Sequence, residues 1–170
     1  MSEEKFKYML ILIHDSTHKI DTGNEFFYSH LENLICLTEK DPAVRKLKIP
    51  GLLETISSEY YEASTWLMNI HDKIHKNFET IFKIFESPNP HHFSYVKRDL
   101  IENIRATLEI LSEQNCSFSR TANILSMLSK TKYKKIKQET ETSIRYLEED
   151  FSVLTKHLYK LEDMLNKLPN

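Results

Sequence analysis

Two short stretches of the sequence carry the same arrangement of histidine and aspartate. The pattern H-D-x-x-H runs from His14 to His18 and again from His71 to His75. Residues four apart lie on one face of a helix, so each copy could offer two imidazoles to a metal ion. The Asp-x-x-His inside each copy is similar to the Glu-x-x-His of di-iron sites in helical bundles. The four histidines are therefore candidate metal ligands.

The expected packing of the helices argues against a shared metal site. If the helices that carry the two copies are parallel neighbours, His14 lies about 16 Å and His71 about 30 Å above the start of its helix. Ligands of one zinc ion must lie about 2 Å from it, so these histidines would not converge. Histidine is intermediate in burial surveys, and the favoured interpretation is a set of partly covered histidines beside an apolar seam. No metal or other cofactor is expected.

The first copy, together with the helical pattern after it, resembles a phosphotransfer hairpin. The tripeptide Ile13-His14-Asp15 is followed by LETI at residues 53–56 and by ASTWLMNI at residues 63–70. This order resembles the phosphoacceptor hairpin of sensor histidine kinases over about residues 9–75. The resemblance implies that His14 takes a phosphoryl group, with Asp15 as the base. The proline that commonly follows the histidine in that family is missing, Gly23 would interrupt the first helix, and nothing after residue 90 resembles an ATP-binding domain.

No other motif predicts catalysis. The two glycines, Gly23 and Gly51, stand alone, so the chain has no glycine-rich loop for a phosphate and no G-x-S-x-G elbow for a nucleophilic serine. We therefore expect a protein that is not an enzyme, with the alternative phosphoacceptor His14 as the one catalytic candidate.

A lysine-rich stretch is the remaining unusual feature. KTKYKKIK, residues 130–137, surrounds Tyr133 with the lysines Lys130, Lys132, Lys134, Lys135 and Lys137. Such a cluster could bind phosphates while the tyrosine stacks on a base. Five acids follow within residues 139–150, and offset charge blocks on one long helix are more typical of a solvated face. The solvated face is favoured, and these lysines are the only candidate patch for nucleic acid. Arg45, Lys46 and Lys48 form a smaller basic group.

Composition and charge indicate a soluble cytoplasmic protein. The net charge is −2, so no overall field draws the chain to nucleic acid or to an anionic membrane, and no membrane partner is expected. The longest apolar run, residues 8–13, is far shorter than the roughly 20 residues of a spanning helix. Cys36 and Cys116 lack any CxxC pattern, so we expect two small buried side chains in a reducing compartment.

The helical period dominates the whole chain, and with only 2 glycines and 5 prolines the composition favours long helices. We predict short helices over residues 3–20 and 25–40, separated at Gly23, and long helices over 51–86, 93–129 and 132–168. The last has the clearest apolar seam, with 3,4 spacing through Ile144, Leu147, Phe151, Leu154, Leu158, Leu161, Leu165 and Leu168. The expected fold is a single all-α domain, residues 1–170, built as an elongated antiparallel bundle of five helices. Its short N-terminal hairpin covers one end of three long helices.

Large apolar residues outside the seams predict an interaction surface. They are Val153, Tyr159 and Met164 in the last helix, and Trp66, Met68, Phe78 and Phe82 in the helix over 51–86. Two short helices could not cover both long ones, and soluble monomers rarely expose large apolar patches. We therefore predict a non-enzymatic helical interaction or scaffold module that binds itself, as a homodimer, or another helical protein. Phosphotransfer at His14 and a metal-binding bundle are the alternatives.

Overall fold

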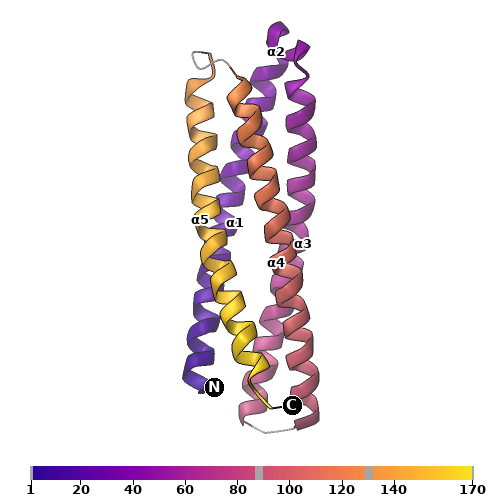
Figure 1. The fold of residues 1–170 in the computed structure, drawn as a ribbon, viewed down its shortest axis with the longest axis vertical. Coiled ribbons are helices and arrows are strands. Elements are labelled where there is room, and N and C mark those ends of the chain that lie inside the picture. Colours follow the sequence, from indigo (N-terminus) through magenta and orange to yellow (C-terminus); the bar gives the residue numbers. More distant parts are fainter. Residues whose placement is uncertain (1, 87–89, 129–131, 170) are drawn as a thin grey trace.

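A computed structural model describes residues 2–86, 90–128 and 132–169. Over these residues the chain forms α1 (Glu3–Glu39), α2 (Pro42–Lys46), α3 (Ile49–Glu86), α4 (Pro90–Met127) and α5 (Lys134–Asn166), with no strand in the same ranges. The four long helices stand side by side in an up-down-up-down path, and the short α2 lies at the upper end (Figure 1). The prediction of an all-α helical bundle is confirmed.

The core lies between the four long helices. Helix α1 packs against α3 and α5, and α4 packs against the same two helices from the other side. The predicted seam of α5 points into this core, since its residues from Ile144 to Leu165 are buried and Leu168 is partly buried. Within the described ranges, no helix combines the length and the apolar character needed to cross a membrane.

The predicted N-terminal hairpin is wrong, because residues 3–20 and 25–40 belong to one continuous helix, α1. Gly23 keeps a negative φ, so it is not a left-handed helix end. A Cβ built on Gly23 would lie 2.5 Å from Leu147 Cδ2. The missing side chain therefore lets α5 approach α1 closely. The next residue, Asn24, is buried and accepts a hydrogen bond from the Tyr60 hydroxyl, which ties α1 to α3.

The continuous α1 covers α3 along its whole length. With 37 residues α1 is about 55 Å long, and α3 has 38 residues. Phe6 at the start of α1 packs edge-on against Phe78 and Phe82, with ring centroids 5.4 and 5.3 Å apart. The expectation that Phe78 and Phe82 remain uncovered is therefore wrong, because it assumed a short helix in this place.

At the upper end, α2 is held by its capping residue. Asp41 precedes the helix, and its Oδ1 accepts a hydrogen bond from the Ala43 amide at 3.0 Å, while Pro42 occupies the first turn. Lys48, in the turn to α3, has a φ of 56°, which reverses the chain within two residues. These contacts fix α2 across the top of the bundle.

Candidate functional site

The two H-D-x-x-H stretches meet between α1 and α3. The His14 ring centroid lies 6.3 Å from that of His71 and 6.5 Å from that of His75. The expected separation in height is wrong, because α1 and α3 are antiparallel rather than parallel. His14 is 11 residues from the start of α1 and His71 is 15 residues from the end of α3, so the two lie at a similar level.

Burial controls the charges of this histidine cluster. His71 is partly buried, and this burial lowers its pKa, opposed by the nearby Asp21 and reinforced by His14. Burial also raises the pKa of Asp21, opposed by His71 and His18. His75 is exposed, and its Nε2 lies 3.6 Å from Glu79 Oε1. The fold therefore disfavours charge at the inner histidine.

The clustered histidines do not form a coordination sphere. Within the described parts of the chain, no three histidine, cysteine, aspartate or glutamate side chains are placed so that they could hold one metal ion. His14 and His18 are both exposed to solvent. The structure thus brings predicted ligands together, but as a surface group of imidazoles.

The alternative phosphoacceptor His14 is accessible. It is exposed on α1, and Asp15 Oδ2 beside it lies 3.4 Å from Lys19 Nζ. The interruption expected at Gly23 is not present, so the helix runs on for 25 residues beyond His14. One of the departures from the histidine-kinase pattern is thereby removed.

The lysine-rich stretch is partly used in the fold. Tyr133 is only 6% exposed, and its hydroxyl donates a hydrogen bond of 2.8 Å to Asp41 Oδ2. Lys132 Nζ donates to the same oxygen at 2.6 Å, and the two donors lower the pKa of Asp41 to about 2. Tyr133 is therefore not placed to stack on a base. Lys130 lies outside the described residues, as does residue 129 of the helix predicted over 93–129.

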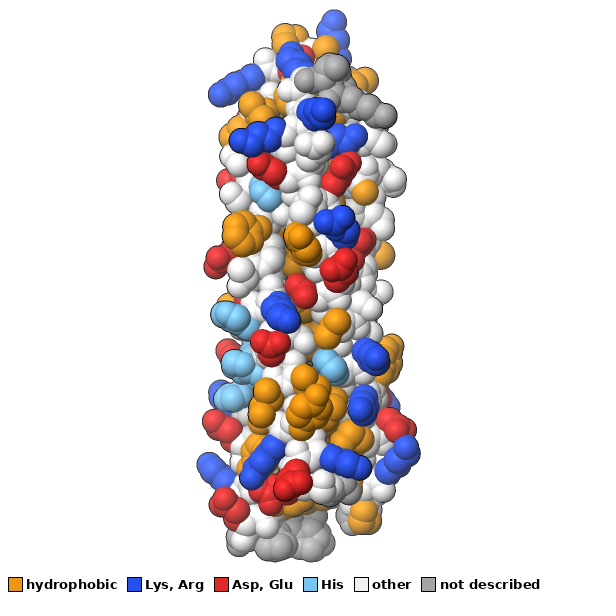
Figure 2. Space-filling model, turned by 90° about the vertical axis from the view of Figure 1, so that its left-hand side faces the viewer, with side chains coloured by type: hydrophobic (Ala, Val, Ile, Leu, Met, Phe, Trp, Pro, Cys, Tyr) orange, Lys and Arg blue, Asp and Glu red, His pale blue; other side chains and the backbone are white. Residues whose placement is uncertain are grey.

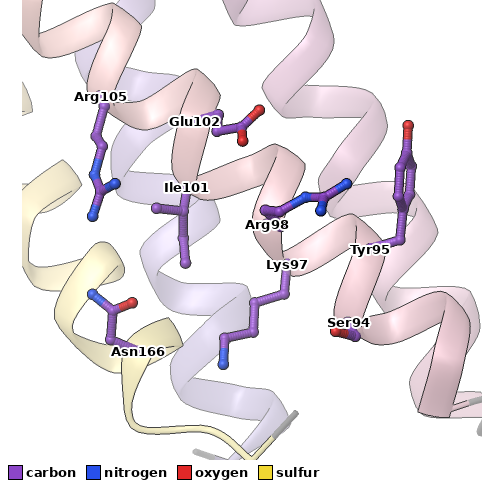
Figure 3. Close-up of a pocket in the computed structure, with 8 residues that line it drawn as sticks. All are labelled: Ser94, Tyr95, Lys97, Arg98, Ile101, Glu102, Arg105 and Asn166. Carbon is purple, nitrogen blue, oxygen red and sulfur yellow. The ribbon is translucent and has the colours of Figure 1, made fainter.

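A cavity of about 690 Å³ lies between α4 and the end of α5 (Figure 3). The cationic side chains that line this cavity contact other groups of the same chain. Lys97 Nζ donates to the Leu168 carbonyl at 2.8 Å, and Arg105 Nε lies 2.9 Å from Glu162 Oε1. Arg98 points the other way, over the ring of Tyr95 (Figure 3). These contacts fasten the end of α5 and do not converge on a ligand.

Two apolar hollows lie on the face formed by α1 and α5, which Figure 2 views directly. The lower hollow, about 490 Å³, is lined by Tyr8, Met164 and Leu168 with three lysines at its edge, Lys5, Lys160 and Lys167. The upper hollow, about 610 Å³, contains Phe26 and Tyr146. Orange hydrophobic side chains gather over both parts of this face in Figure 2.

Sequence reasoning named Met164 on this face but missed its aromatic residues. Tyr8 and Phe26 are each 60% exposed and Tyr146 is 56% exposed. Each is the sequence neighbour of a buried core residue, for example Phe26 beside Phe27. The helical period of the buried residues therefore indicates that these aromatic side chains point away from the core. The prediction that the two cysteines are buried is wrong, and the same argument from the helical period explains why. Cys36 and Cys116 are both exposed, since they lie on the outer sides of their helices.

Comparison of the chain with models of protein families, with curated proteins and with solved structures finds no match.

Proposed function

We propose that this protein is a helical interaction module that uses its α1–α5 face to bind a second copy of itself. The observation that carries the proposal is the pair of apolar hollows on one straight face. Three aromatic side chains at these hollows, Tyr8, Phe26 and Tyr146, are more than half exposed. Large apolar side chains exposed together on a protein surface are typical of an interaction site.

The spacing of the hollows suits a helical partner. Tyr8 and Phe26 are 18 residues apart on α1, a separation of about 27 Å along the helix. A partner helix of five turns, laid along the groove between α1 and α5, would reach both. Aromatic side chains are enriched among the residues that dominate binding energy, so Phe26 and Tyr146 are the expected anchors.

A second copy of the chain could fill both hollows at once. A two-fold axis lying in the plane of the interface, perpendicular to the long axis of the bundle and midway between the hollows, would bring the upper hollow of each copy against the lower hollow of the other. Such a self-complementary arrangement is the commonest form of soluble oligomer. Lys5, Lys160 and Lys167 at the lower hollow would then approach both Glu139 and Lys135 at the upper hollow of the second copy.

Light scattering and sedimentation velocity on the purified chain test this proposal. We expect a mass near twice the 20.2 kDa of one chain at micromolar concentration. The double variant Phe26→Ser, Tyr146→Ser should weaken the dimer at least about tenfold, the loss typical of an aromatic anchor. The matched control Tyr61→Ser, Trp66→Ser removes two exposed aromatic side chains from α3 and should leave the mass unchanged.

Two results would reject a dimer formed through the α1–α5 face. A mass of 20.2 kDa at all concentrations would leave a different helical protein as the partner of this face. Equal weakening by the two double variants would mean that association does not use the α1–α5 hollows.

Phosphotransfer at His14 is the second candidate, favoured by the continuous helix and the exposed imidazole. The chain would then accept a phosphoryl group from a donor and pass it on, with Asp15 as the base that the resemblance implies. Incubation with acetyl phosphate or phosphoramidate, followed by intact mass spectrometry at neutral pH, tests this function. An acid-labile phosphate that disappears in His14→Gln but persists in His18→Gln would support it, and an unmodified protein would contradict it.

A further inference from the structure

The upper end of the bundle gathers two basic segments that are far apart in the sequence. Residues 40–48 and 132–137 together contain eight lysines and arginines and one acid, Asp41, which gives +7, whereas the whole chain carries −2. Seven of the cations are exposed, namely Lys40, Arg45, Lys46, Lys48, Lys132, Lys134 and Lys135. Blue side chains crowd this end in Figure 2, while charges of both signs mix along the body of the bundle.

Asp41 holds the two basic segments in one place. Its carboxylate accepts hydrogen bonds from the Ala43 amide of α2 and from Lys132 and Tyr133, just before α5. The single acid of the two segments therefore links one segment to the other. The cations of α2 and of early α5 are consequently presented as one fixed surface, which we call the basic end.

The basic end also carries exposed apolar side chains. Leu47 is 53% exposed in the turn between α2 and α3, with Lys46 and Lys48 on either side, while Val44 in the same segment is buried. Leu52 near the start of α3 and Met127 at the end of α4 are exposed as well. An apolar tip flanked by lysines is the arrangement that a bilayer surface favours, because the apolar group enters the interface while the ammonium groups stay among the headgroups.

We propose that the basic end binds the surface of a lipid bilayer rich in anionic headgroups. The geometry favours a bilayer over nucleic acid because the one aromatic ring among the lysines, Tyr133, is buried and hydrogen-bonded. Proteins that bind single-stranded nucleic acid typically combine a basic groove with exposed aromatic rings on which the bases stack. The contact is peripheral, with the long axis of the bundle pointing away from the membrane.

Binding to this surface is separate from self-association through the α1–α5 face. The Arg45–Lys48 turn does not line either hollow, and of the seven exposed cations of the basic end Lys135 alone lines one, the upper hollow. A monomeric protein could bind the bilayer, and a dimer could form without lipid, so the two proposals can fail independently.

Vesicle co-sedimentation with the full chain tests the proposal. Vesicles of phosphatidylcholine with about one third phosphatidylserine should bind the protein, and pure phosphatidylcholine vesicles should not. Binding should weaken as salt is raised, because salt screens the attraction between exposed cations and headgroups. The triple variant Arg45→Gln, Lys46→Gln, Lys48→Gln should bind roughly 100-fold more weakly, given the contribution of each cation near an anionic surface.

Two further variants separate the contributions of position and of the apolar tip. The matched control Lys73→Gln, Lys76→Gln, Lys83→Gln removes three exposed cations from the half of α3 that lies away from the basic end and should change binding less than about threefold. Leu47→Ser should weaken binding roughly tenfold at high salt, where the apolar contribution remains. Circular dichroism would check that each variant keeps its helices.

Three results would overturn the proposal. The first is no binding to phosphatidylserine vesicles at low salt. The second is an equal loss in the two triple variants, which would indicate attraction by overall charge. The third is binding of a fluorescent oligonucleotide that depends on Arg45, Lys46 and Lys48 while vesicles are ignored, which would make the basic end a nucleic-acid surface.

Discussion

Replacing Gly23 by alanine tests the close approach of α1 and α5. Two opposing effects decide whether the free energy of unfolding rises or falls. In a helix interior, alanine is favoured over glycine by about 1 kcal/mol. Against this, the new Cβ would lie 2.5 Å from Leu147 Cδ2 and 3.1 Å from Leu147 Cγ. Because Cγ is also too close, turning the end of the leucine does not relieve the clash, and Leu147 is fully buried.

Overpacking of this kind costs about 1–3 kcal/mol, so it exceeds the gain in helix propensity. We expect Gly23→Ala to lower the free energy of unfolding by about 1 kcal/mol, which combines the two effects. Gly51→Ala is the matched control, because no atom lies within 4 Å of its added Cβ. That variant should be neutral or stabilised by up to about 1 kcal/mol. Urea unfolding followed by circular dichroism measures both.

A double-variant cycle separates steric clash from backbone conformation. In a Leu147→Ala background the clash is removed, so Gly23→Ala should become stabilising, with a coupling energy of about 1–3 kcal/mol. A glycine that ends a helix in a left-handed conformation would instead be destabilised equally in both backgrounds. Equal destabilisation would therefore refute the continuous α1.

The remaining predictions concern polar groups. Tyr60→Phe should cost about 1–3 kcal/mol in urea unfolding, because it leaves the buried Asn24 oxygen without its donor. The fold loses stability as pH falls from 3.8 towards about 2, since Lys132 and Tyr133 keep the folded-state pKa of Asp41 at about 2. Asp41→Asn should remove that acid dependence and lower the melting temperature at neutral pH. His71→Gln should reduce the loss of stability below pH 6.5, because burial lowers the pKa of His71 and the folded state resists its protonation. Zinc should leave the melting temperature unchanged, and a rise that vanishes in His71→Ala would reinstate a metal site.

The parts of the fold that depend on local pattern could be predicted from the sequence. The 3,4 spacing of α5 fixes which residues face the core, and Leu147, Phe151 and Leu154 are buried as expected. The helix boundary at Gly23 could not be predicted in the same way. Asp21-Thr22-Gly23-Asn24 has the composition of a helix end, and only Leu147, 124 residues later, identifies this glycine as a packing residue.

The helix boundary wrongly predicted at Gly23 also led to a wrong prediction for the histidine cluster. Two short helices would send the chain up and then back down before α3, which places His14 and His71 on parallel helices at different heights. A single α1 makes α3 antiparallel and brings their rings within 6.3 Å. The basic end was hidden for a related reason, because the hydrogen bonds of Asp41 to Lys132 and Tyr133 join segments 91 and 92 residues apart.

The four long helices form a ring in which each packs against two others, and the chain directly connects all but one of the neighbouring pairs. Three of the four neighbouring helix pairs are joined by short connections, while α1 and α5, which also pack together, are linked only through the rest of the protein. Helix α1 begins and α5 ends at the same end of the bundle (Figure 1). Folding must therefore bring together two segments separated by almost the whole chain. A short covalent link between the ends would remove this loop-closure entropy from the unfolded state, on the order of 5 kcal/mol for a loop of this length.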